Sequence, residues 1–171
     1  ACFDEPKQKL MEYCIENLNA LVKVAEEENV ILLLGTVMGM DSPCNASTPI
    51  VLTVDEVAEI IEQIGSSYLA AYADTQVLSI RGESLTDWFD RLGEKVRLVR
   101  FTDGNYNGYR IWGKGVLPAE KLAEEIYRTG FNGLISFQIP GERYCENPKD
   151  AQKQNHFRAL SAWREVMDCQ R

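Results

Sequence analysis

A short apolar segment near the start of the chain reads Val30-Ile31-Leu32-Leu33-Leu34. It is too short for an ordinary helix, and its unbroken apolar character is typical of a parallel strand that is buried on both faces. Before it, apolar residues recur at three- and four-residue spacing over Lys7–Glu28, which predicts an amphipathic helix. After it, Thr53 and Glu56 have the spacing of a capping box at the start of another helix. The segment is therefore predicted to be a strand between two helices.

The same strand-and-helix unit recurs along the rest of the chain. Three more short apolar segments are predicted strands: Tyr68–Ala73, Val96–Thr102 and Leu134–Ile139. The helices that follow the strands are predicted to begin at Thr53, Ser84 and Pro118, and the last one spans Lys149–Met167. One helix followed by four strand–helix units predicts an α/β fold with four parallel strands and right-handed crossovers. No linker or change of composition divides the chain, so residues 1–171 are predicted to form a single domain.

Composition and charge exclude several classes of protein. The 171 residues are 45% hydrophobic and 26% charged, an ordinary balance for a globular chain. No apolar run approaches the roughly 20 residues of a membrane-spanning helix, so no membrane partner is expected. Acidic residues outnumber basic ones by 26 to 18, so a phosphate backbone is repelled on average and nucleic acid is not an expected partner.

The cysteines and the histidine point to a reduced compartment and away from a metal site. The five cysteines are scattered and none has CxxC spacing, so we interpret them as reduced thiols and the chain as cytoplasmic. The single histidine, His156, is interpreted as a surface residue near the polar start of the last helix. A histidine-rich metal site is therefore not expected.

Ligands of parallel α/β folds bind at the carboxyl ends of the strands, and in this chain those ends carry polar side chains. They are Thr36, Asp74, Arg100, Thr102, Asp103 and Gln138. Alternate side chains of a strand share a face, so Asp74, Arg100 and Gln138 converge if those faces share a centre. Asp74 and Arg100 are then expected to form a charge pair, whose role is either functional or only structural.

Six segments together resemble a known family in their order and spacing. They are Ala25–Leu34, Tyr72–Thr75, Glu83–Phe89, Phe101–Asn105, Gly108–Gly115 and Gly133–Gln138. The chain resembles the sugar phosphate isomerase/epimerase family, the xylose isomerase-like TIM barrels, and is most similar to the fructoselysine and ketose 3-epimerases. The resemblance runs from about Lys7 to Met167 and covers the carboxyl half of the family's barrel, strands five to eight. It implies that residues 1–171 form a half-barrel.

The resemblance also implies that the family's metal site is changed. Members typically hold one divalent metal, such as Mn or Mg, between a glutamate, an aspartate, a histidine and a second glutamate. The two glutamates also move the proton on the sugar carbon. These four positions fall on Gly35, Asp74, Arg100 and Gln138, and a substrate-binding histidine falls on Val77. Asp74 is then the only retained ligand, so no metal cofactor is predicted and the catalytic residues are unknown.

A sugar-binding surface is predicted at the same strand ends and in the loop 103–115. Its predicted substrate-binding residues are Asp74, Arg100, Asp103, Tyr109, Arg110, Trp112 and Gln138. The indole face of Trp112 can stack on a sugar ring, and Arg110 with Lys114 can hold a phosphate. For each loop residue taken alone, packing within the loop or exposure to solvent is the alternative interpretation.

The resemblance and the predicted site residues lead to two hypotheses of function, and in both the ligand is a small sugar or sugar phosphate. In the first, the chain is an isomerase/epimerase-family protein that lacks the family's metal-dependent proton transfer. In the alternative, it is a pseudoenzyme, a non-catalytic sugar-binding or structural half-barrel that works with a partner chain or is a fragment of a longer barrel. Whether any catalysis remains is left open. Because a half-barrel exposes the edges of its sheet, a homo-oligomer or an amino-half partner is expected to complete it.

Overall fold

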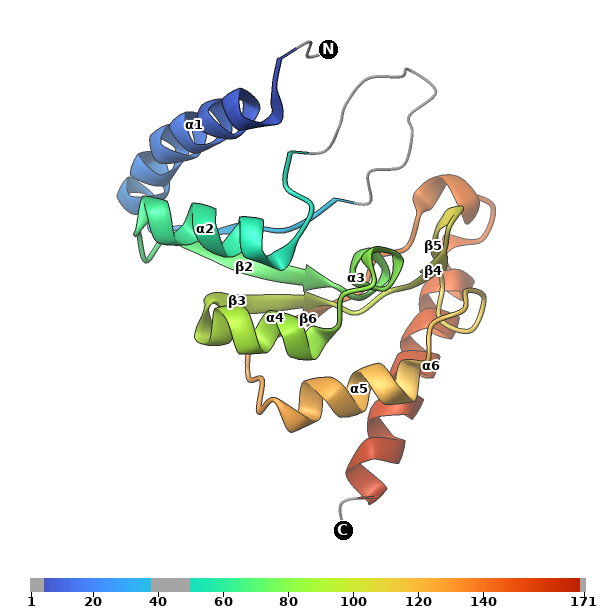
Figure 1. The fold of residues 1–171 in the computed structure, drawn as a ribbon. Helices are drawn as coiled ribbons and strands as arrows, with labels where there is room; N and C mark the ends of the chain where they lie inside the picture. Colours follow the sequence, from blue (N-terminus) through green and yellow to red (C-terminus); the bar gives the residue numbers. More distant parts are fainter. Residues whose placement is uncertain (1–4, 38–49, 170–171) are drawn as a thin grey trace.

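Four parallel strands form the main sheet, as predicted, in the order β1-β2-β3-β6 (Figure 1). The computed structural model describes residues 5–37 and 50–169. The strands are β1 (Leu32–Leu34), β2 (Leu69–Asp74), β3 (Val96–Arg100) and β6 (Leu134–Ser136). The register places Asp74 beside Arg100, and Arg100 beside Ser136. Polar residues from three neighbouring strands therefore lie in a row at one end of the sheet.

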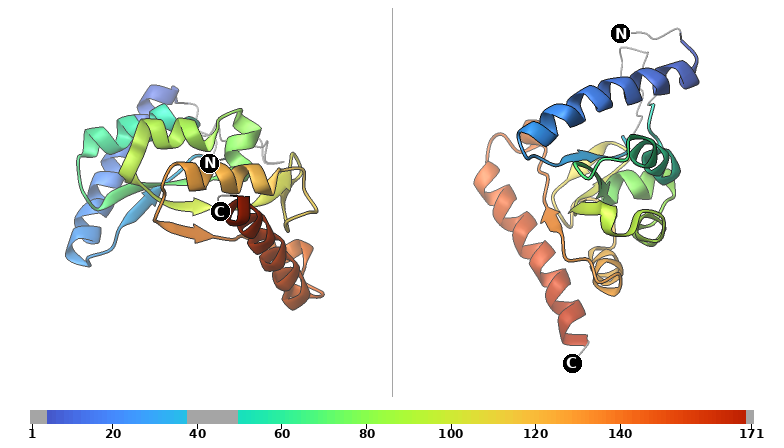
Figure 2. Two further views of the ribbon diagram at one scale, coloured as in Figure 1. Left: turned by 90° about the horizontal axis from the view of Figure 1, so that it is seen from below. Right: turned by 90° about the vertical axis from the view of Figure 1, so that its left-hand side faces the viewer.

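Helices follow one another along the outside of this sheet. They are α1 (Lys7–Glu27), α2 (Val54–Ile64), α3 (Thr75–Arg81), α4 (Leu85–Leu92), α5 (Ala119–Arg128) and α6 (Pro148–Cys169). Helix α1 contacts α2, α2 contacts α4, α4 contacts α5, and α5 contacts α6. Figure 2 shows α2, α4 and α5 on one side of the sheet, with α1 and α6 at its opposite ends. No helix of the described residues is long and apolar enough to cross a membrane.

Local capping chemistry sets the starts of two helices, as the sequence predicts. Thr53 and Glu56 form the capping box of α2, and Ser84 and Asp87 form that of α4. Helix α2 ends at Gly65, whose φ of 68° is the left-handed conformation that glycine adopts readily. These ends depend only on neighbouring residues, which is why the sequence alone predicts them.

The core lies between the sheet and the helices. Trp88 of α4, Val99 of β3 and Phe101 are fully buried. The Phe101 ring packs against Trp112, with ring centroids 4.4 Å apart, and against Trp163, with centroids 6.1 Å apart. The core is therefore centred on β3 and the segment that follows it.

One helix and one two-stranded hairpin were not predicted. Helix α3 begins directly after Asp74, where the sequence analysis placed only a strand end. The segment 103–115 was interpreted as a loop, but it contains an antiparallel hairpin of β4 (Asp103–Asn105) and β5 (Gly108–Arg110). Two short 3-10 turns, Gly93–Lys95 and Gly141–Arg143, complete the described elements.

The first strand departs from the prediction of burial on both faces, and the last strand is exposed as well. Val30 is 53% exposed, Ile31 is 45% exposed, and both lie before the three-residue strand β1. Strand β6 is shorter than predicted, and Leu134 is 70% exposed. Among the strands that the structure describes, each of these two pairs on one side only, so neither has the two neighbours that bury a central parallel strand. The predicted burial of Val30–Leu34 on both faces is therefore wrong.

Smaller departures concern single residues. Tyr127 of α5 is 41% exposed, although it adjoins the buried Ile126. Of the cysteines, Cys14, Cys145 and Cys169 are free thiols, and Cys2 and Cys44 lie outside the described residues. Residues 38–49, between the first strand and the helix predicted to begin at Thr53, also lie outside them. His156 is exposed, as interpreted, and contacts the Phe137 ring edge-on.

Candidate functional site

Asp74 is the centre of a buried polar cluster at the carboxyl end of the sheet. It is the last residue of β2 and the N-cap of α3, and it is only 3% exposed. Its Oδ1 accepts hydrogen bonds from the backbone N–H groups of Gln76 (3.0 Å) and Val77 (3.3 Å) and from the Thr102 hydroxyl (3.0 Å). Its Oδ2 accepts one from the Tyr109 hydroxyl at 2.8 Å. Both carboxylate oxygens are thus already engaged.

Burial and these hydrogen bonds act in opposite directions on the Asp74 carboxyl. Burial disfavours its charged form and raises its pKa, and the hydrogen bond from Tyr109 is the largest opposing effect. The net result is a raised pKa for Asp74. Burial and the Asp74 charge also raise the pKa of Tyr109, so its hydroxyl stays protonated and donates.

Arg100 lies beside Asp74 on the neighbouring strand and forms the predicted charge pair. Its Nη1 is 3.6 Å from Asp74 Oδ2. Its guanidinium carbon is 4.8 Å from the centroid of the Tyr72 ring, within the range of a cation–π contact. The Arg100 side chain is 32% exposed, whereas the Asp74 side chain is 2% exposed. The positive charge of Arg100 is therefore partly exposed to solvent, and the buried Asp74 is its counter-ion.

Tyr72 also fills the space next to Gly35, at the end of β1. A Cβ on Gly35 would lie 2.6 Å from two atoms of the Tyr72 ring and 2.9 Å from the Tyr72 carbonyl oxygen. No real Cβ contact is that short, so a side chain at this position requires Tyr72 to move. Gly35 is the position that the resemblance assigns to a glutamate. The Tyr72 ring occupies the space that a side chain there would need, and the same ring contacts the Arg100 guanidinium.

The donor set does not fit a divalent cation. A hard cation takes several oxygen ligands, and Asp74 is the only carboxylate of the cluster, with both oxygens already accepting hydrogen bonds. The positive charge of Arg100 stands beside it. Within residues 5–37 and 50–169, no three His, Cys, Asp or Glu side chains gather as metal ligands do.

Thr75 and Thr102 hold the ends of β2 and β3 together beneath this cluster. The Thr75 hydroxyl donates to the Thr102 carbonyl at 2.7 Å and accepts from the Thr102 backbone N–H at 2.8 Å. Both residues are buried, at 0% and 1% exposure. The two strand ends that carry Asp74 and Arg100 are therefore fixed relative to each other.

Asp103 has a structural role, contrary to the predicted contact with substrate. It is 1% exposed. Its carboxylate accepts from four backbone N–H groups: Gly104 (2.7 Å), Gly113 (2.9 Å), Gly115 (2.9 Å) and Leu117 (3.1 Å). A Cβ on Gly115 would collide with the carboxylate. Asp103 therefore folds the segment around the hairpin and has no oxygen left for a ligand.

Trp112 packs in the core, so its indole face is not open to a sugar ring as predicted. It is 4% exposed, and its Nε1 donates to the Phe101 carbonyl at 3.2 Å. Its backbone N–H donates to Asn155 Oδ1 at 2.7 Å, which ties the loop to α6. The alternative interpretation, packing within the loop, is the one that the structure shows.

The remaining predicted residues are only partly brought together. Tyr109 reaches Asp74, as described above. Arg110 is half-buried and its Nη1 donates to the Tyr109 carbonyl at 3.3 Å, and Lys114 is exposed. Gln138 is half-buried and takes part in no hydrogen bond or ion pair with other described residues. The predicted convergence of Gln138 with Asp74 and Arg100 stays a prediction.

Sequence reasoning missed Tyr72, although a signal for it was present. Tyr72 precedes Asp74 by two positions in a predicted strand, so the two side chains share a face. The contact between Tyr109 and Asp74 had no such signal, because it depends on the hairpin that brings residue 109 back over the sheet.

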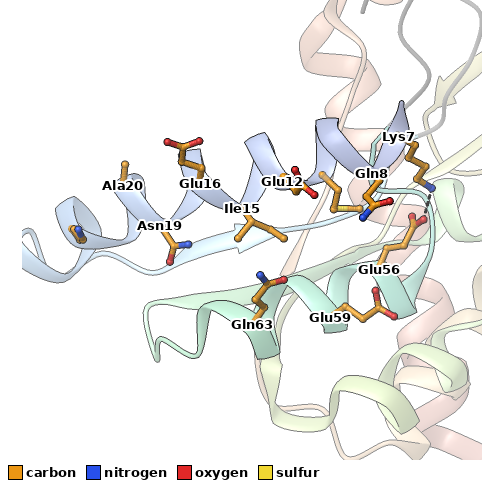
Figure 3. A pocket seen from close by; sticks show the side chains of 12 residues that line it. Lys7, Gln8, Glu12, Ile15, Glu16, Asn19, Ala20, Glu56, Glu59 and Gln63 are labelled. Carbon is orange, nitrogen blue, oxygen red and sulfur yellow. Dashed lines mark hydrogen bonds and ion pairs between the residues drawn. The ribbon is translucent and has the colours of Figure 1, made fainter. Parts of the chain in front are cut away.

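Two cavities lie apart from this cluster. A groove of about 980 Å³ runs between α1 and α2, and Figure 3 shows Ile15 and Asn19 facing Glu59 and Gln63 across it. A Lys7–Glu56 ion pair closes one end of this groove. A second cavity of about 690 Å³ lies between β6 and α6. Neither is lined by Asp74 or Arg100, so cavity size alone does not locate the site.

Comparisons with known proteins agree with this architecture. The family model described as "Xylose isomerase-like TIM barrel" matches residues 3–163. A fructoselysine 3-epimerase from Escherichia coli O157:H7 is 26% identical over 151 residues, which are 85% of this chain and 52% of the relative. The chain therefore belongs to the xylose isomerase-like TIM barrel family.

Solved structures show the same fold. A D-psicose 3-epimerase from Clostridium cellulolyticum H10, solved with D-tagatose, has a TM-score of 0.67 and 18% identity, covering 96% of this chain and 58% of its own. The IOLI protein, solved with a bound zinc atom, has a TM-score of 0.75 and 15% identity, covering 96% and 60%. The chain thus spans only about half the length of its relatives and matches part of their barrel.

Proposed function

We propose that this chain is a sugar- or sugar-phosphate-binding member of the isomerase/epimerase family that lacks the metal-dependent proton transfer of the family. One observation carries the proposal. Arg100, stacked on Tyr72 and paired with Asp74, places a fixed positive charge where the family resemblance places a metal ligand. A guanidinium presents several N–H donors in a rigid fork, which suits hydroxyl, enolate or phosphate oxygens.

The proton-transfer groups that the resemblance expects are absent from these positions. Gly35 has no side chain, and Gln138 has an amide, which hydrogen-bonds a sugar hydroxyl but does not act as a base near neutral pH. Asp74 is a carboxylate, but its oxygens are engaged and it is buried. Binding without turnover is therefore the function that this chain's own residues support best.

The alternative is a structural half-barrel, and it is supported by the edges of β1 and β6 that have no partner among the described strands. In that case the chain works with a partner chain or is part of a longer barrel, and any acid and base come from outside these residues. The free thiols of Cys14, Cys145 and Cys169 support a reduced, cytoplasmic setting for either function.

The proposal is tested by calorimetric titration with D-fructose and with D-fructose 6-phosphate, in buffer containing EDTA. The test variant is Arg100→Met, and the matched control is Arg97→Met, the same change at an exposed position of the same strand. We expect Arg100→Met to weaken binding about tenfold or more, because hydrogen bonds to a charged group are worth about 1.5–3 kcal/mol. Arg97→Met is expected to bind like the unaltered chain.

Two results contradict the proposal. One is that neither sugar binds, or that both variants bind equally well. The other is that sugar analysis after incubation shows an epimer that forms only when MnCl2 replaces EDTA, because that result restores the family's metal-dependent reaction.

A further inference from the structure

Four groups other than Arg100 donate hydrogen bonds to the buried carboxylate of Asp74. Its Oδ1 accepts two from backbone N–H groups at the start of α3 and one from the Thr102 hydroxyl. Its Oδ2 accepts one from the Tyr109 hydroxyl at 2.8 Å. Arg100 Nη1 is 3.6 Å from the same Oδ2, farther than the length of about 2.7–2.9 Å of a charge-assisted hydrogen bond. The carboxylate is therefore hydrogen-bonded without a close contact from Arg100.

Tyr109 reaches this carboxylate from the hairpin rather than from the main sheet. It lies in β5, which pairs only with β4 among the described strands. Burial and the Asp74 charge raise the pKa of Tyr109, and Arg100 opposes this rise only in part. The hydroxyl therefore stays protonated and occupies the oxygen that Arg100 would otherwise approach.

The contact that holds the Arg100 guanidinium does not consume its N–H groups. The guanidinium carbon is 4.8 Å from the centroid of the Tyr72 ring, and a cation–π contact takes no hydrogen bond from the cation. The side chain is 32% exposed, so a ligand can reach it. A guanidinium has five N–H donors, and Arg100 can therefore offer several of them to a ligand.

We infer that Tyr109 is a positioning residue that keeps Arg100 available to the phosphate group of a phosphorylated sugar by occupying Asp74 Oδ2. This inference rests on the proposed function and narrows its ligand to an anionic sugar. A guanidinium binds two phosphate oxygens at once through paired N–H donors. A neutral sugar offers the same donors only hydroxyl oxygens, and those hydrogen bonds are weaker.

Removal of the Tyr109 hydroxyl turns this arrangement into an ordinary ion pair. A buried carboxylate oxygen that loses its donor is costly to leave unsatisfied. Arg100 is the cation beside it, and a shift of roughly 1 Å brings Nη1 from 3.6 Å to hydrogen-bond length. The N–H groups that then bind Asp74 are lost to a phosphate group. Tyr109 thus acts on the ligand through Asp74 and Arg100.

Calorimetric titration of the purified protein with D-fructose 6-phosphate and with D-fructose, in buffer containing EDTA, tests the inference. The unaltered chain is compared with Tyr109→Phe, with Asp74→Asn and with the two substitutions combined. The matched control is Tyr106→Phe, the same change in the turn between β4 and β5, at a residue that is 74% exposed. Circular dichroism and melting curves show whether each variant folds.

We expect the unaltered chain to bind D-fructose 6-phosphate about tenfold or more tightly than D-fructose, because charge-assisted hydrogen bonds are roughly twice as strong as neutral ones. Tyr109→Phe should remove most of this preference, and Tyr106→Phe should leave it unchanged. In the Asp74→Asn background, Tyr109→Phe should have little effect, since no carboxylate remains to bind Arg100. A merely structural role of Tyr109 predicts the same loss in both backgrounds.

A second measurement needs no sugar and separates this inference from the proposed function. Phenylglyoxal modifies accessible guanidinium groups, and mass spectrometry of the peptide that contains Arg100 gives the rate at that residue. We expect Tyr109→Phe to slow the modification severalfold, but not in the Asp74→Asn background. If neither sugar binds although this rate falls as expected, the failure lies in the proposed function and not in the role of Tyr109.

Three outcomes overturn the inference. Equal affinity of the unaltered chain for both sugars removes the phosphate preference and leaves the proposed function in place. An equal loss from Tyr109→Phe with and without Asp74→Asn shows that Tyr109 does not act through the carboxylate. An unchanged rate of Arg100 modification in Tyr109→Phe shows that the guanidinium does not depend on that hydroxyl.

Discussion

The centre of the sheet and its two edges are built from similar residues but have opposite properties. β2 is LAAYAD and β1 is LLL, yet Leu69 of β2 is 1% exposed, whereas all three leucines of β1 are only half-buried. The difference lies in the neighbours, because β2 and β3 pair with a strand on each side, whereas β1 and β6 pair with only one of the described strands. Burial here is a property of position in the sheet rather than of the strand's own sequence.

The candidate site belongs to the centre. Asp74 ends β2, Arg100 ends β3, and the Thr75–Thr102 pair fixes these two strand ends. At the edges, Gly35 follows β1 and Gln138 follows β6, and the structure gives neither a polar contact with Asp74 or Arg100. The well-packed centre therefore orders its charged pair without any contact from the edge positions Gly35 and Gln138.

The largest expected effect is the loss of a central core side chain. Phe101→Ala removes a fully buried ring that packs against Trp112 and Trp163, and should lower the free energy of unfolding by about 3–5 kcal/mol. Leu134→Ala in β6, where the side chain is 70% exposed, should change it by no more than about 0.5 kcal/mol. Urea unfolding at low protein concentration measures both, and equal losses contradict the contrast between centre and edge.

Next in size is the buried carboxylate that folds the hairpin segment. Asp103→Asn replaces one carboxylate oxygen by an amide nitrogen, so two of the four backbone N–H groups lose their acceptor. We expect a loss of about 2–3 kcal/mol in unfolding free energy. Asp90→Asn, at an exposed position of α4, is the control and should be near neutral. A neutral Asp103→Asn would mean that the hairpin does not depend on this carboxylate.

A smaller loss of unfolding free energy is expected at the contact between Gly35, which follows the outer strand β1, and Tyr72 of the central strand β2. Gly35→Ala places a Cβ against the Tyr72 ring and its carbonyl, and should cost about 1–3 kcal/mol by overpacking. Gly141→Ala, where a Cβ meets nothing within 4 Å, is the control. Adding Tyr72→Leu should recover part of the loss, since the ring is removed and the carbonyl stays. If the losses of unfolding free energy from Gly35→Ala and Tyr72→Leu simply add in the double variant, the contact between the two positions is contradicted.

The smallest expected effect is a change in pH dependence. The pKa of Asp74 is raised in the folded chain above the ordinary value of about 3.9, so the folded state holds the Asp74 proton more tightly than the unfolded state. The stability that comes from this proton is fully present below the unfolded pKa and is lost as the pH rises through the folded pKa. Asp74→Asn should therefore gain stability relative to the unaltered chain as the pH rises through that window, measured by urea unfolding. A difference between the two chains that does not vary with pH contradicts the raised pKa.

Much of the fold could be predicted from the sequence because its signals are local. The capping boxes at Thr53 and Ser84 and the stop at Gly65 need only neighbouring residues, and the alternation of strands and helices sets the parallel sheet. Helix α3 was not predicted, because its start is the same Asp74 that was interpreted as a strand end. The burial of the first and last strands was not predictable from their own residues, since it depends on what lies beside them.

The candidate site was predicted in part, for the same reason. The Asp74–Arg100 pair follows from strand ends in register and is confirmed. The roles of Asp103 and Trp112 depend on how the segment 103–117 folds back, which no short-range pattern indicates. The position of Tyr72 could have been predicted, because the alternation of side chains along a strand places Tyr72 and Asp74 on the same face.

One measurement tests most directly whether Arg100 stands in place of a metal. The chain is freed of metal with EDTA, dialysed, and titrated with MnCl2 in a calorimeter, with Asp74→Asn as the matched variant. We predict no stoichiometric Mn²⁺ site, because Asp74 alone offers a carboxylate and its oxygens are engaged. Tight binding of one Mn²⁺ per chain that disappears in Asp74→Asn would contradict the account and restore a metal to the centre of the sheet.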